Sequence, residues 1–257
     1  MKSITLSSAP STNAYVAAHA DTLPCPCVVR AVDQTAGRGQ RGNHWESEPG
    51  KNLTVSYYLR PEGVHPREQF AISEAIALAV ADTLRRYGVE ARVKWPNDIY
   101  VGDLKICGIL IEHSLYGTEI RHSIAGIGLD VNQTVFLSDA PNPVSMANLT
   151  GREYDLVEVM EILSQNVERR MKCVRTPEGR ILLHDEFKRN LWRGEGGPWP
   201  FRDTATGRTF AARIADITPA GLLTLRVEEA SEVEEASGLL RPAETKTYAF
   251  KEVSFIL

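Results

Sequence analysis

The sequence predicts an α+β fold, in which helices cover a mixed or antiparallel sheet and a smaller β domain follows. Apolar residues recur at helical spacing over 66–88 and 154–192, whereas short runs rich in β-branched and aromatic residues precede and separate these segments. After the glycine-rich linker at 194–198, the chain changes to short alternating runs separated by turns. We therefore expect two domains, at 1–192 and 193–257.

The first predicted helix begins near Ser11. Ser11, Thr12 and Asn13 precede an alanine-rich segment, and side-chain oxygens at this place are typical of a helix N-terminus. Capping accounts for one of the three residues, so all three together also suggest a ligand contact. Strands are predicted at 27–32 and 53–59 on either side of a glycine-rich loop.

A long amphipathic helix is predicted over 66–88, because its apolar positions fall on one side of the helical wheel. Strands at 91–95, 105–113 and 121–131 should follow, joined by turns at 96–98 and 116–117. Helices are then expected over 154–192. In the last domain, the runs 210–214 and 223–227 indicate strands of a small barrel, and the acidic stretch 228–235 is expected to be a solvated loop.

The composition excludes several functions. A formal net charge of -4 gives no electrostatic support for nucleic-acid or membrane binding. The four cysteines do not have the spacing of a metal framework, and the six histidines lack the paired spacing of a zinc site. No segment has the length of a signal peptide core or a membrane span. We expect free thiols, no metal site in the protein itself and a cytoplasmic location.

The most informative segment is the glycine-rich loop at 37–42, which is followed by Trp45. Glycines let the backbone approach a ligand, and arginine donates a planar set of hydrogen bonds to phosphate or carboxylate oxygens. The spacing matches G-x-G-x-x-G, but a dinucleotide site needs a helix after the third glycine. Pro49 and Gly50 follow instead, so we exclude that site; an ordinary surface loop remains the alternative.

Three further motifs follow. The string 94–98 places a lysine, a tryptophan, a proline and two turn-forming residues at a strand end, and Lys105 begins the next strand. Gly126 and Gly128 remove side chains from a third strand, so that a ligand or another backbone can approach. Taken singly, a turn, an exposed charge and a packing bulge explain these motifs better than a ligand site does.

Together and in this order, the motifs resemble the biotin protein ligase family. The resemblance includes Ser11-Thr12-Asn13, Gly37-Arg38-Gly39, Trp45, Lys94-Trp95-Pro96-Asn97-Asp98, Lys105 with Gly108-Ile109-Leu110 and Glu112, and Gly126-x-Gly128-x-x-x-Asn132. It implies a class II synthetase-like catalytic domain and a C-terminal SH3-like β-barrel. It also implies a two-step reaction with ATP, Mg²⁺ and biotin, in which biotin becomes biotinyl-5'-AMP and then passes to a lysine of a biotin carboxyl carrier protein.

The resemblance also implies roles for individual residues. Lys105 and Arg38 are the expected catalytic cations, because a carboxylate and a triphosphate repel each other unless cations hold both. The expected biotin-binding residues are Ser11, Thr12, Asn13, Gln34 and Gly108. The expected ATP and adenylate residues are Gly37, Arg38, Gly39, Gln40, Arg41, Trp45, Lys94, Asn97, Lys105 and Asn132. Asp98 is expected either to form the turn or to act through magnesium.

Two departures from the family pattern limit what it implies. Many members have arginine where this chain has the uncharged Gln40, so retention of the adenylate is expected to differ. Only ten residues precede Ser11, so a DNA-binding repressor domain is not expected. A lipoate ligase and a non-catalytic biotin sensor remain alternatives, and both monomers and homodimers occur in the family.

Overall fold

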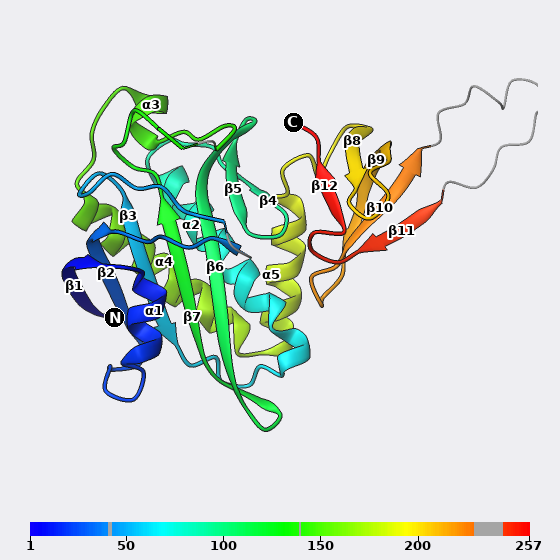
Figure 1. The fold of residues 1–257 in the computed structure, drawn as a ribbon. Coiled ribbons are helices and arrows are strands. Elements are labelled where there is room, and N and C mark those ends of the chain that lie inside the picture. Colours follow the sequence, from blue (N-terminus) through cyan, green and yellow to red (C-terminus); the bar gives the residue numbers. More distant parts are fainter. Residues whose placement is uncertain (41–42, 139, 229–243) are drawn as a thin grey trace, which may run out of the picture.

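The computed structural model describes residues 1–40, 43–138, 140–228 and 244–257, which form a seven-stranded and a five-stranded sheet (Figure 1). In order across it, the large sheet contains β1 (Lys2–Ala9), β2 (Cys27–Gln34), β3 (Leu53–Leu59), β7 (Glu119–Leu129), β6 (Leu104–Tyr116), β5 (Asp98–Val101) and β4 (Arg92–Lys94). β1 is parallel to β2, and the other neighbours are antiparallel. The predicted mixed sheet is confirmed.

Two strands of this sheet were not predicted. β1 lies at the edge and is mostly exposed, so its serine-rich sequence carries little apolar alternation. β5 has only four residues and begins at Asp98, within the segment where a simple turn was expected. The prediction that 96–98 leads directly to the strand at 105–113 is therefore wrong, because a four-residue strand is too short to show a period.

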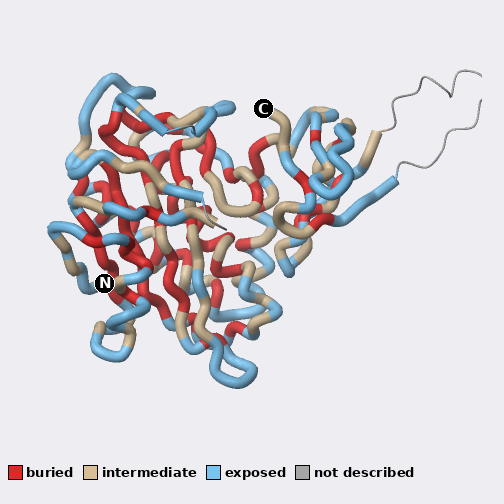
Figure 2. The backbone as a smooth tube through the Cα atoms, viewed as in Figure 1, coloured by how far each residue is buried: buried red, intermediate tan, exposed pale blue. Residues whose placement is uncertain are grey.

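Helices cover both faces of the large sheet. α2 (Phe70–Arg86), α4 (Leu156–Val174) and α5 (Pro177–Arg189) lie on one face and share its main apolar core, as the predicted helical segments require (Figures 1 and 2). A 3-10 turn (Pro66–Glu68) precedes α2, and the short α3 (Met146–Thr150) was not predicted. α1 (Thr12–Ala18) covers part of the opposite face, where Val16 packs in a smaller cluster.

Strand register decides which side chains face α1. Successive side chains of a strand point to opposite faces, so Cys107 and Ile109 of β6 join the main core while Gly108 lies on the other face. Gly108 pairs with Gly128, and Leu110 pairs with Gly126. The sheet face beside α1 therefore has no side chains at three neighbouring positions of β6 and β7, which leaves room above the backbone.

The second sheet has the order β11 (Thr245–Tyr248), β10 (Leu223–Glu228), β9 (Thr209–Ile217), β8 (Trp199–Asp203) and β12 (Val253–Phe255), with antiparallel pairing throughout. The strands predicted at 210–214 and 223–227 are confirmed. In the described residues, no pairing joins β11 to β12. Apart from Glu228, the acidic stretch 228–235 lies outside the described residues.

The two sheets are in contact. Trp95 Nε1 donates a hydrogen bond to the carbonyl of Gly221 at 2.9 Å, and the rings of Trp192 and Phe255 pack edge to face. All four cysteines are free thiols, as expected. None of the helices in the described residues combines the length and apolar character needed to cross a bilayer.

Candidate active site

The start of α1 brings three predicted biotin-binding residues against the sheet. Ser11 is the N-cap, and its Oγ accepts a hydrogen bond from the Ala14 N–H, which confirms the capping prediction. Thr12 and Asn13 form the first turn and are buried. Their side chains therefore point into the protein, where polar groups need hydrogen-bond partners.

Those partners come from three strands. Gln34 Oε1 at the end of β2 accepts the Thr12 N–H at 2.9 Å, and Asn13 Nδ2 donates to Glu112 Oε2 of β6 at 2.7 Å. Ser56 Oγ of β3 lies 2.7 Å from Thr12 Oγ1 and 2.6 Å from Asn13 Oδ1. The predicted residues thus belong to one buried polar network, of the kind that recognises a neutral polar head group.

The sequence analysis missed Ser56 in this network. Ser56 is fully buried in the middle of an apolar strand, and this buried hydroxyl is the signal that could have identified it. Gly126 is also required, because a Cβ atom there would lie 2.4 Å from Asn13 Oδ1. Glu112 was part of the recognised motif, but no role was given to it.

The glycine loop turns back over the sheet. The Trp45 N–H donates to the carbonyl of Gly37 at 3.0 Å, and the Gly39 N–H donates to the carbonyl of Asn43 at 2.7 Å. The described part of this loop contains no α-helix, the element that a dinucleotide site needs after its third glycine. Arg41 and Gly42 lie outside the described residues.

Arg38 and Asn13 meet at the same carboxylate. Arg38 NH2 lies 3.7 Å from Glu112 Oε2, the oxygen that accepts from Asn13, and the Arg38 side chain is half exposed. Guanidinium groups can bind phosphate or carboxylate oxygens through two parallel hydrogen bonds. Arg38 is thus positioned beside the polar network and remains open to a ligand.

The Trp45 indole rests on the glycine pair of β6 and β7. A Cβ atom at Gly128 would lie 2.4 Å from Trp45 Cε2, and one at Gly108 would lie 2.9 Å from Cζ3. A larger residue at either position would displace the indole. Gly108 therefore contributes to the site by having no side chain. Trp45 Nε1 is buried without a hydrogen-bond partner in the described residues, which leaves a donor for a ligand.

Lys105 lies close to the Trp45 indole. Its Nζ lies 5.6 Å from the Trp45 ring and 2.7 Å from Asp98 Oδ1. About a third of the Lys105 side chain is exposed. Gly108 and Gly128 form a floor without side chains. Lys105 and Arg38 therefore flank this floor, and each lies beside a carboxylate.

Two other predicted residues are engaged elsewhere. Lys94 Nζ donates to Tyr100 OH at 2.8 Å and lies over the Trp192 and Phe255 rings; burial lowers its pKa. Both ends of the Asn132 amide pair with the backbone of Tyr154. Their roles at the nucleotide stay predictions.

Asp130 is a buried acid that the sequence analysis did not assign. It follows Gly128 by two residues, and only 2% of its surface is exposed. Its Oδ1 has no hydrogen-bond partner in the described residues, and burial raises its pKa well above the usual value. The field of Lys105 acts in the opposite direction but does not cancel this effect.

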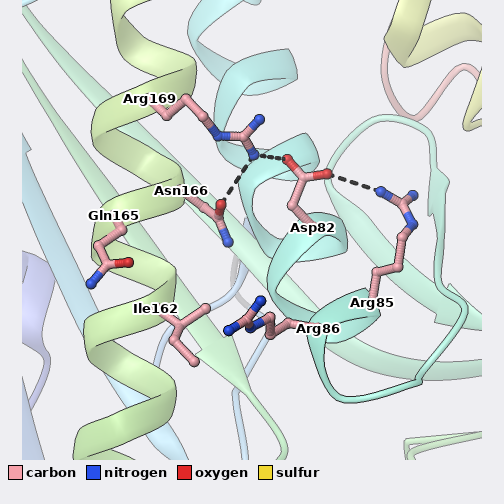
Figure 3. A pocket seen from close by; sticks show the side chains of 7 residues that line it. All are labelled: Asp82, Arg85, Arg86, Ile162, Gln165, Asn166 and Arg169. Atoms are coloured by element: carbon pink, nitrogen blue, oxygen red, sulfur yellow. Dashed lines mark hydrogen bonds and ion pairs between the residues drawn. The ribbon is translucent and has the colours of Figure 1, made fainter.

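A hollow of about 500 Å³ lies away from this site, between α2 and α4. Its lining includes Asp82, Arg85 and Arg169 (Figure 3). None of the predicted site residues lines it. Asp82 accepts hydrogen bonds from Arg85 of the same helix and from Arg169 of α4, so the second contact joins the two helices.

In the described residues, no three histidine, cysteine or acidic side chains gather as a metal site. Magnesium that accompanies ATP is usually held by phosphate oxygens with only one or two carboxylates. Asp98, beside Lys105, fits that requirement.

The chain was compared with known proteins. Residues 6–130 match the biotin/lipoate A/B protein ligase family. The chain is 37% identical to the bifunctional ligase/repressor BirA of Salmonella typhimurium over 122 residues, which cover 47% of this chain and 38% of that protein. It is 34% identical to the biotin–[acetyl-CoA-carboxylase] ligase of Paracoccus denitrificans over 161 residues, with 60% and 66% covered.

Solved structures share the fold. The biotin protein ligase from Aquifex aeolicus in complex with biotin and ATP superposes with a TM-score of 0.76 and 20% identity, covering 98% of this chain and 97% of that one. The ligase from Leishmania major in complex with biotinyl-5-AMP gives 0.63 and 17%, with 96% and 98% covered. The matches to BirA of Salmonella typhimurium and of Bacillus subtilis span only 38% and 48% of those proteins. Residues 6–130 therefore form a domain of the biotin/lipoate A/B protein ligase family, and the relatives named here are bifunctional ligase/repressors and biotin ligases.

Proposed function

We propose that the chain is an ATP-dependent biotin protein ligase. The biotin carboxylate attacks the α-phosphorus of ATP to give biotinyl-5'-AMP and pyrophosphate. A lysine amine of a biotin carboxyl carrier domain, such as that of acetyl-CoA carboxylase, then attacks the acyl carbon and releases AMP.

One arrangement supports this proposal above all. Arg38 and Lys105 flank the floor formed by Gly108 and Gly128, and the polar network of Thr12 and Asn13 lies beside it. Two cations can hold a carboxylate and a triphosphate together and stabilise the charge that develops between them. The neutral polar network suits the ureido ring of biotin, which both donates and accepts hydrogen bonds.

In this proposal, Lys105 and Arg38 bind the reacting carboxylate and phosphate oxygens, assisted by N–H groups near Gly37 and Gly39. Ser11, Thr12, Asn13 and Gln34 bind the head group, and Ser56 holds two of them in place. Trp45, whose indole occupies this floor in the structure, moves aside and closes over the ligand and adenine. Gln40, Arg41, Lys94, Asn97 and Asn132 lie near the nucleotide. Asp98 would hold magnesium together with the ATP phosphates, and the ion would neutralise part of their charge.

The test mixes the protein with ATP, magnesium and either biotin or lipoate and measures pyrophosphate release. A biotin carrier domain is then added, and its mass is measured. We expect release with biotin and a mass increase of one biotinyl group. Release only with lipoate would identify a lipoate ligase, and release without transfer would identify a biotin sensor.

Several finer features belong to the same proposal. Residues 193–257 form an SH3-like barrel, and the catalytic domain comprises 1–192. The protein is cytoplasmic and can form homodimers. Gel filtration with light scattering tests the oligomeric state, and adenylate dissociation from the protein and from a Gln40→Arg variant tests whether Gln40 shortens its retention.

A further inference from the structure

Glu112 of β6 lies on the same face of the large sheet as the candidate active site. It follows Gly108 by four residues, and alternate positions of a strand share one face. Its partner on β7 is Ile124, which packs with Val16 of α1 in the smaller apolar cluster. The Glu112 carboxylate therefore lies beside the start of α1 and not on the face that α2 covers.

One oxygen of this carboxylate has two partners. Glu112 Oε2 accepts a hydrogen bond from Asn13 Nδ2 at 2.7 Å and lies 3.7 Å from Arg38 NH2. Asn13 belongs to the polar network proposed to bind the head group of biotin, and Arg38 is one of the two proposed catalytic cations. Glu112 thus connects the part of the site that recognises biotin with the part that carries out the reaction.

The hydrogen bonds of Asn13 decide which way round its amide lies. Nδ2 donates to Glu112 Oε2 and lies 3.2 Å from the carbonyl oxygen of Leu110, so both of its hydrogens meet acceptors. Oδ1 lies 2.6 Å from the Ser56 hydroxyl, which uses one of its two lone pairs. Turning the amide over would place Oδ1 against two acceptors. Glu112 therefore helps to keep the second lone pair of Oδ1 available to an N–H group of a ureido ring.

The contact between Glu112 and Arg38 is weak enough to be exchanged. The two side chains are 43% and 50% exposed, and exposed pairs of this kind favour their partner by no more than roughly fivefold. A carboxylate beside Arg38 takes the place of a substrate carboxylate or phosphate, because the guanidinium binds all of these through the same donors. Lys105 has a similar counter-ion, with Asp98 Oδ1 at 2.7 Å.

We propose that Glu112 is a positioning residue with two roles in this site; the inference rests on the proposed ligase function. Its carboxylate orients the Asn13 amide for the head group of biotin, and it is the counter-ion from which substrate oxygens must take Arg38. The second role weakens the binding of ATP, because a negative charge beside an anion site opposes an incoming anion. The first role needs only an acceptor atom, whereas the second needs the charge.

Glu112→Gln separates the two roles, because glutamine keeps an acceptor oxygen for Asn13 but has no charge. The ATP concentration that gives half-maximal single-turnover pyrophosphate release should fall roughly two- to fivefold, the range of an exposed ion pair. The maximal rate should stay within about twofold of the wild type, as expected when ground state and transition state are affected equally. Added salt should narrow the difference in half-saturating ATP, because salt screens exposed charges.

The orienting role is measured with biotinol, the alcohol analogue of biotin, which has the head group but no carboxylate. Its Kd should stay within about twofold of the wild type in Glu112→Gln and rise at least roughly threefold in Glu112→Ala, because the Asn13 amide there loses a hydrogen bond to a charged group. Glu112→Met repeats this measurement with the length of the side chain preserved. Glu153→Gln is the matched control, since Glu153 pairs with Lys51 outside the site, and it should change neither constant.

Unchanged or higher half-saturating ATP in Glu112→Gln would overturn the counter-ion role. A wild-type Kd for biotinol in both Glu112→Ala and Glu112→Met would overturn the orienting role, and if only one of these variants folds, that variant decides. A wild-type protein that binds biotinol but releases no pyrophosphate with biotin would overturn the ligase function itself, while the biotinol measurements would still test the orientation of Asn13.

Discussion

At the scale of single residues, Lys105 lies at the candidate active site but contributes little to the stability of the fold. Its ion pair with Asp98 is partly exposed, and pairs of this kind contribute about 0 to 1 kcal/mol to stability. The same ammonium lies next to the floor on which the two substrates are proposed to meet. Its removal should therefore affect chemistry far more than folding.

Lys105→Ala should lower the single-turnover rate of biotin-dependent pyrophosphate release by roughly 10²- to 10³-fold, the usual effect of losing one electrostatic contact to the transition state. Its melting temperature should stay close to that of the wild type. Lys51→Ala is the control, because Lys51 also pairs with an acid, Glu153, but outside the site. Near-normal adenylation by folded Lys105→Ala would remove Lys105 from the mechanism.

Asp130→Asn should stabilise the protein at neutral pH. Folding raises the pKa of this carboxyl, so the folded state binds more protons than the unfolded state between the two pKa values. The stability that the protonated acid contributes is full below the unfolded pKa and is lost as pH rises through the folded pKa. We expect a gain of about 1 to 3 kcal/mol, the cost of an unsatisfied buried group.

The measurement is urea unfolding of both proteins at several pH values between 4 and 8. The difference in unfolding free energy between Asp130→Asn and the wild type should grow as the pH rises. Above the unfolded pKa, the wild-type carboxyl must either keep its proton or ionise in a buried place, and both cost free energy. A difference that does not vary with pH would contradict the assignment.

The motifs identified several of the site residues but not the neighbours that those residues contact. Asn13, Gln34, Arg38 and Lys105 were identified because their types and order are distinctive. Ser56 and Asp130 were missed, since a serine in a strand or an acid after a glycine pair is informative only once burial is known.

At the scale of elements, one buried arginine connects three helices. Arg170 of α4 donates from Nε to Asp82 of α2 at 2.8 Å and from NH2 to Glu186 of α5 at 2.7 Å. Arg169 also reaches Asp82, from the exposed rim of the hollow in Figure 3. The two neighbouring arginines thus share one acid but differ in burial.

Arg170→Ala should cost about 1.5 to 3 kcal/mol of unfolding free energy, because Glu186 loses its arginine and Asp82 keeps only the more exposed Arg85 and Arg169. Arg169→Ala should cost about 0 to 1 kcal/mol, since its side chain is more than half exposed. Denaturant unfolding of the two variants measures both values. Equal losses would show that Asp82 does not depend on the buried partner.

Element prediction succeeded where the apolar pattern was long. α2 and α4 extend over 17 and 19 residues, enough for several turns to repeat the same face. β1 and β5 were missed because an exposed edge strand and a four-residue strand carry too few apolar positions. Their places are decided by pairing with β2 and β6, which is a tertiary effect.

At the scale of the whole molecule, the β9–β10 turn makes one of the contacts between the two sheets. Gly221 follows Ala220 in the β9–β10 turn, has a φ of +84° and accepts the Trp95 hydrogen bond through its carbonyl. A Cβ atom at Gly221 would lie 2.5 Å from Phe70 Cδ2, at the start of α2. The close approach of the domains therefore requires glycine here.

Gly221→Ala should destabilise the protein more than Gly207→Ala. Both glycines have positive φ, so alanine costs roughly 1 to 2 kcal/mol at either position. Nothing lies within 4 Å of a Cβ at Gly207, whereas Gly221→Ala must also displace Phe70, which adds about 1 to 3 kcal/mol. Equal losses in denaturant unfolding would contradict the contact between the turn and α2.

The sequence predicted two units from the linker composition but not how they meet. Trp95 was recognised as part of a site motif, yet its indole nitrogen bonds to the second sheet. The sequence does not predict this hydrogen bond, because only folding brings Trp95 and Gly221 together. The second sheet is therefore in contact with the segment before β5 as well as forming a sheet of its own.

The β6–β7 hairpin ends in an exposed tip at Tyr116 and Gly117, far along the ladder from Gly108 and Gly128. Cutting the backbone at this tip would put Arg38 and Lys105 on one fragment and Gly128 on the other. Neither piece would then carry a complete reaction centre, and only re-pairing of the two long strands would restore it. The hairpin is thus a natural place to divide the polypeptide into a two-part reporter whose output depends on fragment association.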